Sequence, residues 1–193
     1  MTDTDDLYAF VFKGALAEDS THRALELDGE APTDLPEKIA QKMPMDLLDK
    51  NFILSASKMA SVYIAIASFE NSARKFIQDR LLEKKGADWW VKCVSKEIRG
   101  EAEKRKNDED QIRWHGARGS SMIFYTQMGD LPTIIQNNFE FFEDYIESVG
   151  WARQIFKALE RSRNVIMHSG ELSMNDIERV AMNIRDWVRQ VGG

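Results

Sequence analysis

The sequence is poor in residues that mark disulfides, turns and membrane spans. Its single cysteine, Cys93, excludes an internal disulfide and a zinc site built from several cysteines. With only 4 prolines, 11 glycines and no clear apolar–polar alternation, the sequence favours a helical chain. The longest apolar stretch, residues 62–68, is too short to cross a bilayer and is closed by Glu70 and Arg74. Since the acidic start also does not resemble a signal peptide, we expect a cytoplasmic protein without membrane contact.

The negative charge of the chain is unevenly distributed. Against 26 Lys and Arg residues stand 32 Asp and Glu residues, a formal charge of -6. Residues 1–50 carry -7 of this and the remainder carries +1. We therefore expect an acidic arm over residues 1–44, with a short helix and a linker, and a helical domain over residues 45–193. A nearly neutral domain remains compatible with a nucleic-acid partner, which needs only a local positive field.

Apolar spacing predicts an all-α antiparallel bundle with one long helix. The long helix is expected over residues 45–84, with a break near residues 55–57 and a stop at Gly86. Further helices are expected over residues 88–98, 130–145, 151–168 and 174–191, the last one behind a capping box. The charged run 101–110 is interpreted as a solvated helix end or an exposed loop. The predicted buried stripe of the long helix consists of Phe52, Met59, Val62, Tyr63, Ile66, Phe69, Phe76 and Ile77.

The segment 161–170 combines arginines, an asparagine and a histidine ahead of a glycine stop. Since a helix turns about 100° per residue, Arg161, Asn164 and His168 fall nearly on one face. Arg163 lies about 140° away from His168, so the two can meet only if His168 lies past the last regular turn. The pair Ser169-Gly170 makes such a helix end feasible.

These residue types suit RNA cleavage without a metal. If the ribose 2′-OH is the nucleophile, the reaction needs a base, an acid for the leaving 5′-oxygen and a cation beside the phosphorane. Histidine can serve either proton role near neutral pH. The planar guanidinium of arginine matches a phosphate, and asparagine can hold either partner in place.

At this point the chain resembles a known family. The segment Arg163-Asn164-x-x-x-His168 is similar to the Arg-x4–6-His motif of HEPN domains. Residues 63–77 resemble the long second helix of HEPN proteins of the transcript-surveillance endoribonuclease type. Trp89-Trp90 and the segment 125–135 fall where such domains have similar residues, so that the resemblance covers about residues 45–191.

The resemblance implies an all-α fold and a metal-independent endoribonuclease that leaves a cyclic or 3′-phosphate and a 5′-OH. It implies no cofactor and no metal, RNA as substrate, and an active site formed across a symmetric homodimer. The implied roles are RNA surveillance or a toxin or defence effector, and an inhibitory protein partner is a further expectation. The alternatives are a non-catalytic HEPN-like dimerisation or interaction module and a nucleotide-binding accessory domain.

The resemblance implies Arg163, Asn164 and His168 as catalytic residues. Arg161 fits the wider motif spacing, and Glu70 and Arg74 match an acidic–basic pair that faces the same site in several HEPN groups. These three are expected supporting residues. In toxins inactivated by nucleotidylation a tyrosine stands two residues after the histidine; here that position is Gly170, which argues against that control.

Each of these residues also has a purely structural interpretation. His168 can cap the carbonyl groups of its own helix. Glu70 and Arg74 can form an ordinary i,i+4 ion pair. The segment 113–118 mixes cations with Trp114 and could stack RNA bases, although an ordinary exposed loop explains it as well. The acids of residues 140–147 are interpreted as a solvated face.

Overall fold

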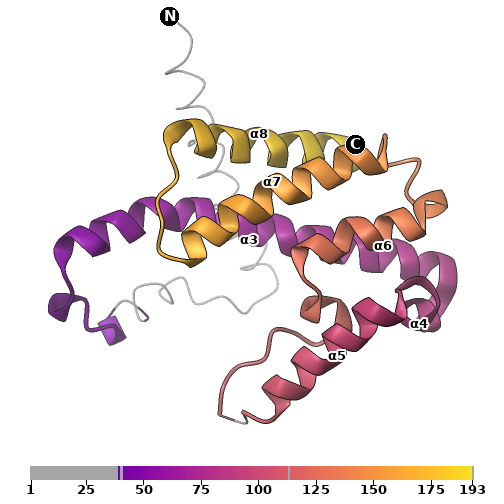
Figure 1. Ribbon diagram of the computed structural model, residues 1–193, viewed down its shortest axis with the longest axis horizontal. Coiled ribbons are helices and arrows are strands. Elements are labelled where there is room, and N and C mark those ends of the chain that lie inside the picture. The colour runs from indigo at the N-terminus through magenta and orange to yellow at the C-terminus, as the bar shows by residue number, and fades with distance from the viewer. Residues whose placement is uncertain (1–38, 40, 113, 193) are drawn as a thin grey trace, which may run out of the picture. The chain divides into compact units, whose positions relative to one another are not determined.

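The computed structural model describes residues 39, 41–112 and 114–192 and divides the chain into two compact units, Met1–Ile53 and Leu54–Gly193 (Figure 1). The predicted arm helix and linker lie outside the described residues. The described part of the first unit contains the short 3-10 helix η1, Met45–Leu47, and the first residues of helix α3.

Helix α3, Lys50–Lys85, is the predicted long helix. It begins later than expected and runs through residues 55–57 without the predicted break. Its buried face follows the predicted spacing at Met59, Val62, Ile66, Phe69 and Ile77.

Two members of the predicted stripe of α3 are exposed, and a third, Phe76, is half-buried. Phe52, in the first unit, is 76% exposed, and Tyr63 is 44% exposed. Tyr63 follows the buried Val62 directly, so the helical rotation of about 100° per residue carries it off the buried face. Glu70 and Arg74 take places on that face instead.

The chain after α3 contains a short 3-10 helix and two α-helices where the sequence predicted one helix. Gly86 has φ +66°, the left-handed conformation that ends α3 as expected. The short helices η2, Gly86–Asp88, and α4, Trp89–Cys93, follow. Val94 is extended, and the Ser95 hydroxyl then accepts from Ile98 N at 3.3 Å to start α5, Lys96–Asp110. The charged run 101–110 therefore belongs to a regular helix, not to a loop.

The helix predicted over residues 130–145 ends early. The structure has η3, Met122–Tyr125, η4, Met128–Asp130, α6, Leu131–Asn137, and η5, Phe139–Phe141. Buried Asn138 donates its side-chain amide to Ile134 O and to Cys93 O, both at 2.8 Å. An asparagine amide that bonds the carbonyl of its own helix and a distant one ends the helix at that point.

The last two helices, α7 (Val149–Met167) and α8 (Met174–Val191), lie side by side and cross α3 (Figure 1). The predicted capping box at Ser173 and Asp176 is present. The Trp187 ring stacks on Trp151 at 5.8 Å and meets Phe69 and Phe156 edge-on, which joins α3, α7 and α8 in one core. The described residues contain helices and no strand, so the predicted all-α fold is confirmed.

Among the described residues, one helical stretch, Lys50–Cys93, is long and apolar enough to cross a membrane. Only 22% of its most apolar window is buried, and core helices of water-soluble proteins meet the same criterion. The expectation of no membrane contact therefore stays a prediction.

Candidate active site

The end of α7 carries the motif histidine. Ser169 has φ 62°, Ser169 N donates to Ile166 O at 2.9 Å, and Gly170 N donates to Val165 O at 2.8 Å. These two bonds form a Schellman motif, which satisfies the last carbonyl groups with backbone N–H groups. His168 is the C-cap residue and its side chain is exposed. Within the described residues the His168 ring has no hydrogen-bond partner. The imidazole therefore does not cap the carbonyl groups of its own helix.

Gly170 is required by the shape of this helix end. A Cβ atom at Gly170 would lie 2.8 Å from Val165 Cγ1 and 3.0 Å from Val165 O. A larger side chain, such as the tyrosine of nucleotidylated toxins, would need a different helix end. The close approach of Gly170 to Val165 thus sets the position of His168.

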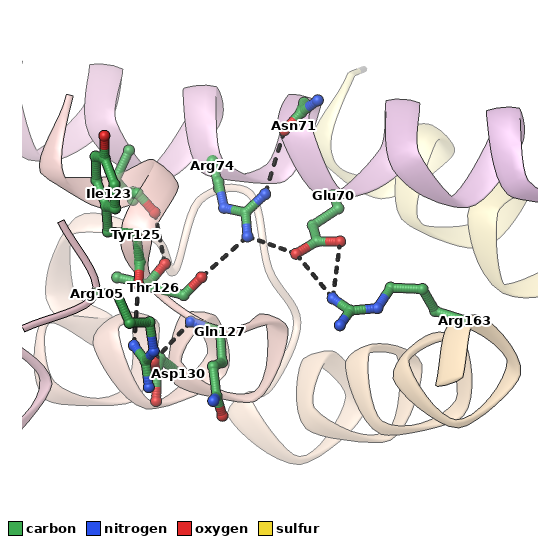
Figure 2. Close-up of polar contacts among 10 residues, drawn as sticks. All are labelled: Glu70, Asn71, Arg74, Arg105, Ile123, Tyr125, Thr126, Gln127, Asp130 and Arg163. Atoms are coloured by element: carbon green, nitrogen blue, oxygen red, sulfur yellow. Dashed lines mark hydrogen bonds and ion pairs between the residues drawn. The ribbon is translucent and has the colours of Figure 1, made fainter. Parts of the chain in front are cut away.

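Glu70 is the centre of a buried ion-pair cluster. Its Oε1 atom lies 2.5 Å from Arg74 Nη2, and Arg163 Nη1 lies 3.4 Å from Oε2 and 3.5 Å from Oε1. Figure 2 shows Arg74 and Arg163 reaching this carboxylate from α3 and α7. The side chains of Glu70 and Arg74 are only 9% and 10% exposed. The i,i+4 pair therefore exists, and the same carboxylate also holds the motif arginine.

Arg74 is fixed by further contacts. It donates to Thr126 O at 3.0 Å and to Asn71 Oδ1 at 3.2 Å. Burial lowers the pKa of Arg74 from its usual value; the Glu70 carboxylate opposes this shift, and the positive charges of Arg163 and Arg118 add to it. Among the described residues, the buried Nε atoms of Arg74 and Arg163 have no hydrogen-bond partner.

Two depressions flank the exposed side of α7. The first, which we call the arginine groove, has a volume of about 620 Å³. It is lined by Asn71, Arg74, Arg105, Arg118, Phe124, Thr126, Gln127, Glu160, Arg163 and Asn164. The second, the histidine pocket, is more open and has a volume of about 490 Å³. It is lined by Lys157, Glu160, Arg161, Asn164, Val165 and His168.

The structure distributes the sequence-derived site residues over both depressions. Arg161 and His168 line the histidine pocket, while Arg74 and Arg163 line the arginine groove. Asn164 and Glu160 line both and connect them. No contact between Arg163 and His168 is found within the described part of this single chain.

Sequence reasoning missed Arg105 and Arg118 as site residues. Arg105 donates to Tyr125 O at 2.9 Å, and Arg118 pairs with Glu109. A signal existed for Arg118, because it belongs to the segment 113–118 in which cations flank Trp114. In that segment Arg113 lies outside the described residues, and Trp114 is 86% exposed.

Among the described residues no group of three or more His, Cys, Asp or Glu side chains is placed to hold a metal ion. Glu140, Glu143, Asp144 and Glu147 are all exposed, as a solvated acidic face requires. Cys93 is buried, and burial raises the pKa of its thiol, which disfavours the reactive thiolate.

Comparison with known protein families supplies the identification. Residues 65–192 match the Swt1-like HEPN family, so the chain belongs to that family and the predicted HEPN relationship is confirmed. The matched span contains the Glu70 cluster and all of α7 and α8. Searches of curated proteins and of solved structures gave no significant match. Membership of the HEPN family fits either an RNase or a HEPN module without catalysis.

Proposed function

We propose that this protein is a metal-independent endoribonuclease of HEPN type. In the proposed reaction the 2′-OH of the RNA attacks the adjacent phosphate and expels the 5′-oxygen, which leaves a cyclic or 3′-phosphate and a 5′-OH. The observation that carries the proposal is the arrangement along α7: Arg163 is anchored to Glu70 in the arginine groove, and His168 stands exposed at the helix end. Asn164 lines the space that both share.

Each of the three motif residues has a separate task in this proposal. His168, whose ring has no hydrogen-bond partner among the described residues, moves a proton to or from the RNA. Arg163 keeps Nη2 available beyond its contact with Glu70 and supplies positive charge to the phosphorane. Asn164, exposed between them, orients the phosphate or the imidazole. Arg161 and Lys157 add positive charge at the histidine pocket.

We further propose that the active form is a homodimer. One chain offers a single motif histidine, whereas the reaction needs both an acid and a base. Two copies of the α7 end would bring two histidines and two motif arginines to one RNA. Exposed apolar side chains next to the motif, Met167 at 57% and Met174 at 55%, are suited to such an interface. A role in RNA surveillance, toxicity or defence, an inhibitory partner and a cytoplasmic location belong to the same proposal.

The test is a cleavage assay on mixed RNAs with the purified protein. We expect His168→Ala to reduce cleavage at least ~100-fold, the low end of general acid–base contributions, with an unchanged circular dichroism spectrum. His115→Ala is the matched control, because His115 is exposed and its ring contacts only its chain neighbours Trp114 and Gly116. Cleavage should persist in EDTA and leave 5′-OH ends. Retained cleavage by pure His168→Ala protein would refute the assignment.

A non-catalytic dimerisation module is the second candidate. It is favoured by the separation of Arg163 and His168 into two depressions in a single chain, together with the exposed apolar side chains of α8, such as Met182 and Val188. Light scattering combined with the cleavage assay distinguishes the two. A clean dimer that cleaves no RNA supports the module, and a cleaving dimer supports the enzyme.

A further inference from the structure

The arginine groove contains more positive charge than the motif requires. Its four arginines come from separate parts of the chain: Arg74 from α3, Arg105 from α5, Arg118 from the segment before η3 and Arg163 from α7. Glu160 is its one lining acid. Carboxylates outside the lining offset the repulsion among these guanidinium groups. Glu70 pairs with Arg74 and Arg163, Glu101 with Arg105, and Glu109 with Arg118.

Backbone carbonyl groups hold two of these arginines in place. Arg105 is bonded to Tyr125 O, and Arg74 is bonded to Thr126 O, so that consecutive carbonyl groups hold neighbouring guanidiniums. Figure 2 shows both side chains converging on this backbone segment. Because these side chains are ordered on folding, a ligand would not have to order them again. A guanidinium has five N–H donors, and the contacts above leave several of them for a ligand.

The groove also contains an aromatic ring. Phe124 lines it, and a Cβ atom placed on Gly119 would lie 2.7 Å from Phe124 Cγ. The absence of a side chain at Gly119 therefore lets the backbone support the ring directly. Amide groups of Asn71 and Gln127 line the same depression. Arginines for phosphate, an aromatic ring for a base and amides for base edges are the parts of a site for single-stranded nucleic acid.

We propose that the arginine groove binds a phosphate of single-stranded RNA next to the cleaved bond, with the adjoining base stacked on Phe124. A volume of about 620 Å³ has room for about one nucleotide. Since Asn164 lines both depressions, a strand seated in the groove continues into the histidine pocket. The proposal rests on the proposed function for the direction of the strand, but binding itself is measurable without cleavage.

The experiment measures binding of a fluorescein-labelled, fully 2′-O-methylated RNA 12-mer, which cannot be cleaved through its 2′-oxygens. Arg118→Gln is the main variant because this side chain is 51% exposed and its loss leaves the core intact. We expect Kd to rise about 5-fold and the salt slope of log K to fall by about 0.7, the value for one phosphate contact of a single strand. Arg179→Gln, an ion-paired arginine of α8 that is 67% exposed, is the matched control and should bind like the wild type.

Phe124→Leu separates stacking from charge. It should weaken binding about 10-fold, the scale of one base–aromatic stack, with an unchanged salt slope. Melting temperatures verify that both variants fold. If Arg118→Gln and Phe124→Leu fold and bind like the wild type, the proposal is wrong. It is also wrong if adenosine monophosphate competes as strongly as the 12-mer, because the groove would then be a mononucleotide site.

Cleavage of an unmodified RNA, run in parallel, distinguishes this proposal from the proposed function. If both groove variants weaken RNA binding but the wild type cleaves no RNA, the groove proposal stands and the proposed endoribonuclease function is wrong. If cleavage depends on His168 while both groove variants bind RNA like the wild type, the proposed function stands and the groove proposal is wrong.

Discussion

The arginine groove and the histidine pocket adjoin each other on α7 but are built in opposite ways. In the groove, backbone carbonyls and the buried carboxylate of Glu70 hold Arg74, Arg105 and Arg163. In the pocket, Arg161, Asn164 and His168 are exposed. Tertiary contacts hold the arginines of one depression in place, and the other presents its histidine on a helix end.

In the proposed function, this difference lets one short motif serve two tasks. A phosphate site gains from rigid, preordered charges, since ordering them on binding would cost affinity. A proton-transferring histidine gains from access to substrate and, in the proposed dimer, to a second chain. Arg163 and His168 are five residues apart in the sequence, yet Arg163 belongs to the rigid side and His168 to the accessible side.

The largest expected effect comes from removing Glu70, the carboxylate that Arg74 and Arg163 share. Glu70→Ala leaves buried Arg74 without its charge partner, and we expect a loss of about 3 kcal/mol in the free energy of unfolding. Asp79→Ala is the matched control: it breaks the i,i+4 pair with Lys75 in the same helix, whose side chains are 51% and 74% exposed, and should cost less than about 1 kcal/mol. Urea denaturation measures both. Equal costs would show that the Glu70 cluster is no more than a surface ion pair.

The next prediction concerns which arginine acts on RNA. Arg163 is anchored to Glu70, whereas Arg161 is exposed, so we expect Arg163→Ala to reduce cleavage about 100-fold, the loss seen when one oriented charge-stabilising group is removed. Arg161→Ala should reduce it less than about 10-fold, one mobile surface charge being worth about a kcal/mol. Initial cleavage rates at matched protein concentration give the comparison. A larger loss of cleavage in Arg161→Ala than in Arg163→Ala would show that Arg161, in the histidine pocket, is the site arginine.

A smaller effect is expected at the helix end that places His168. Gly170→Ala forces a Cβ atom against Val165 and should lower the free energy of unfolding by about 1–2 kcal/mol, the usual cost of overpacking. Gly100→Ala in α5 meets nothing within 4 Å and should instead stabilise by about 0.5 kcal/mol. Chemical denaturation of the two variants tests this, and cleavage should fall only in Gly170→Ala. Normal cleavage there would mean that the placement of His168 tolerates a rearranged helix end.

The smallest effect is a pH dependence at the start of α8. The Ser173 hydroxyl, which donates to Asp176 Oδ2 at 2.6 Å, lowers the pKa of Asp176, and Arg179 lowers it further. A carboxyl group with a lowered pKa in the folded state stabilises the fold above its unfolded pKa, and this contribution disappears as the pH falls through the folded pKa.

At pH 6 the wild type should therefore have a higher melting temperature than Asp176→Asn. This difference should shrink below about pH 4, which is the pKa of an aspartate in an unfolded chain. Circular dichroism melts between pH 6 and pH 2.5 measure it. Asp186→Asn, on the same helix, is the control. A difference that stays constant with pH would show that the carboxylate charge contributes nothing to this cap.

The sequence predicted those features that depend on neighbours within a turn or two. The capping box at Ser173, the stop at Gly86 and the end of α7 before Gly170 are all local, and each was found where expected. Other features depended on distant partners. Asn138 ends α6 partly through a bond to Cys93 O, and Arg105 and Arg118 enter the groove from elements whose packing no local pattern encodes.

The sequence alone determined the helical class, the helix ends at Gly86, Ser173 and Gly170 and the motif spacing that leads to the HEPN family, since these follow from local sterics, local hydrogen bonds and apolar periodicity. Only the tertiary structure decided that Glu70 is shared by Arg74 and by Arg163, 93 residues further along the chain. The physical reason is that a carboxylate in water would gain little from either arginine. Packing α7 against α3 removes that water and makes the pairing of the three charges obligatory.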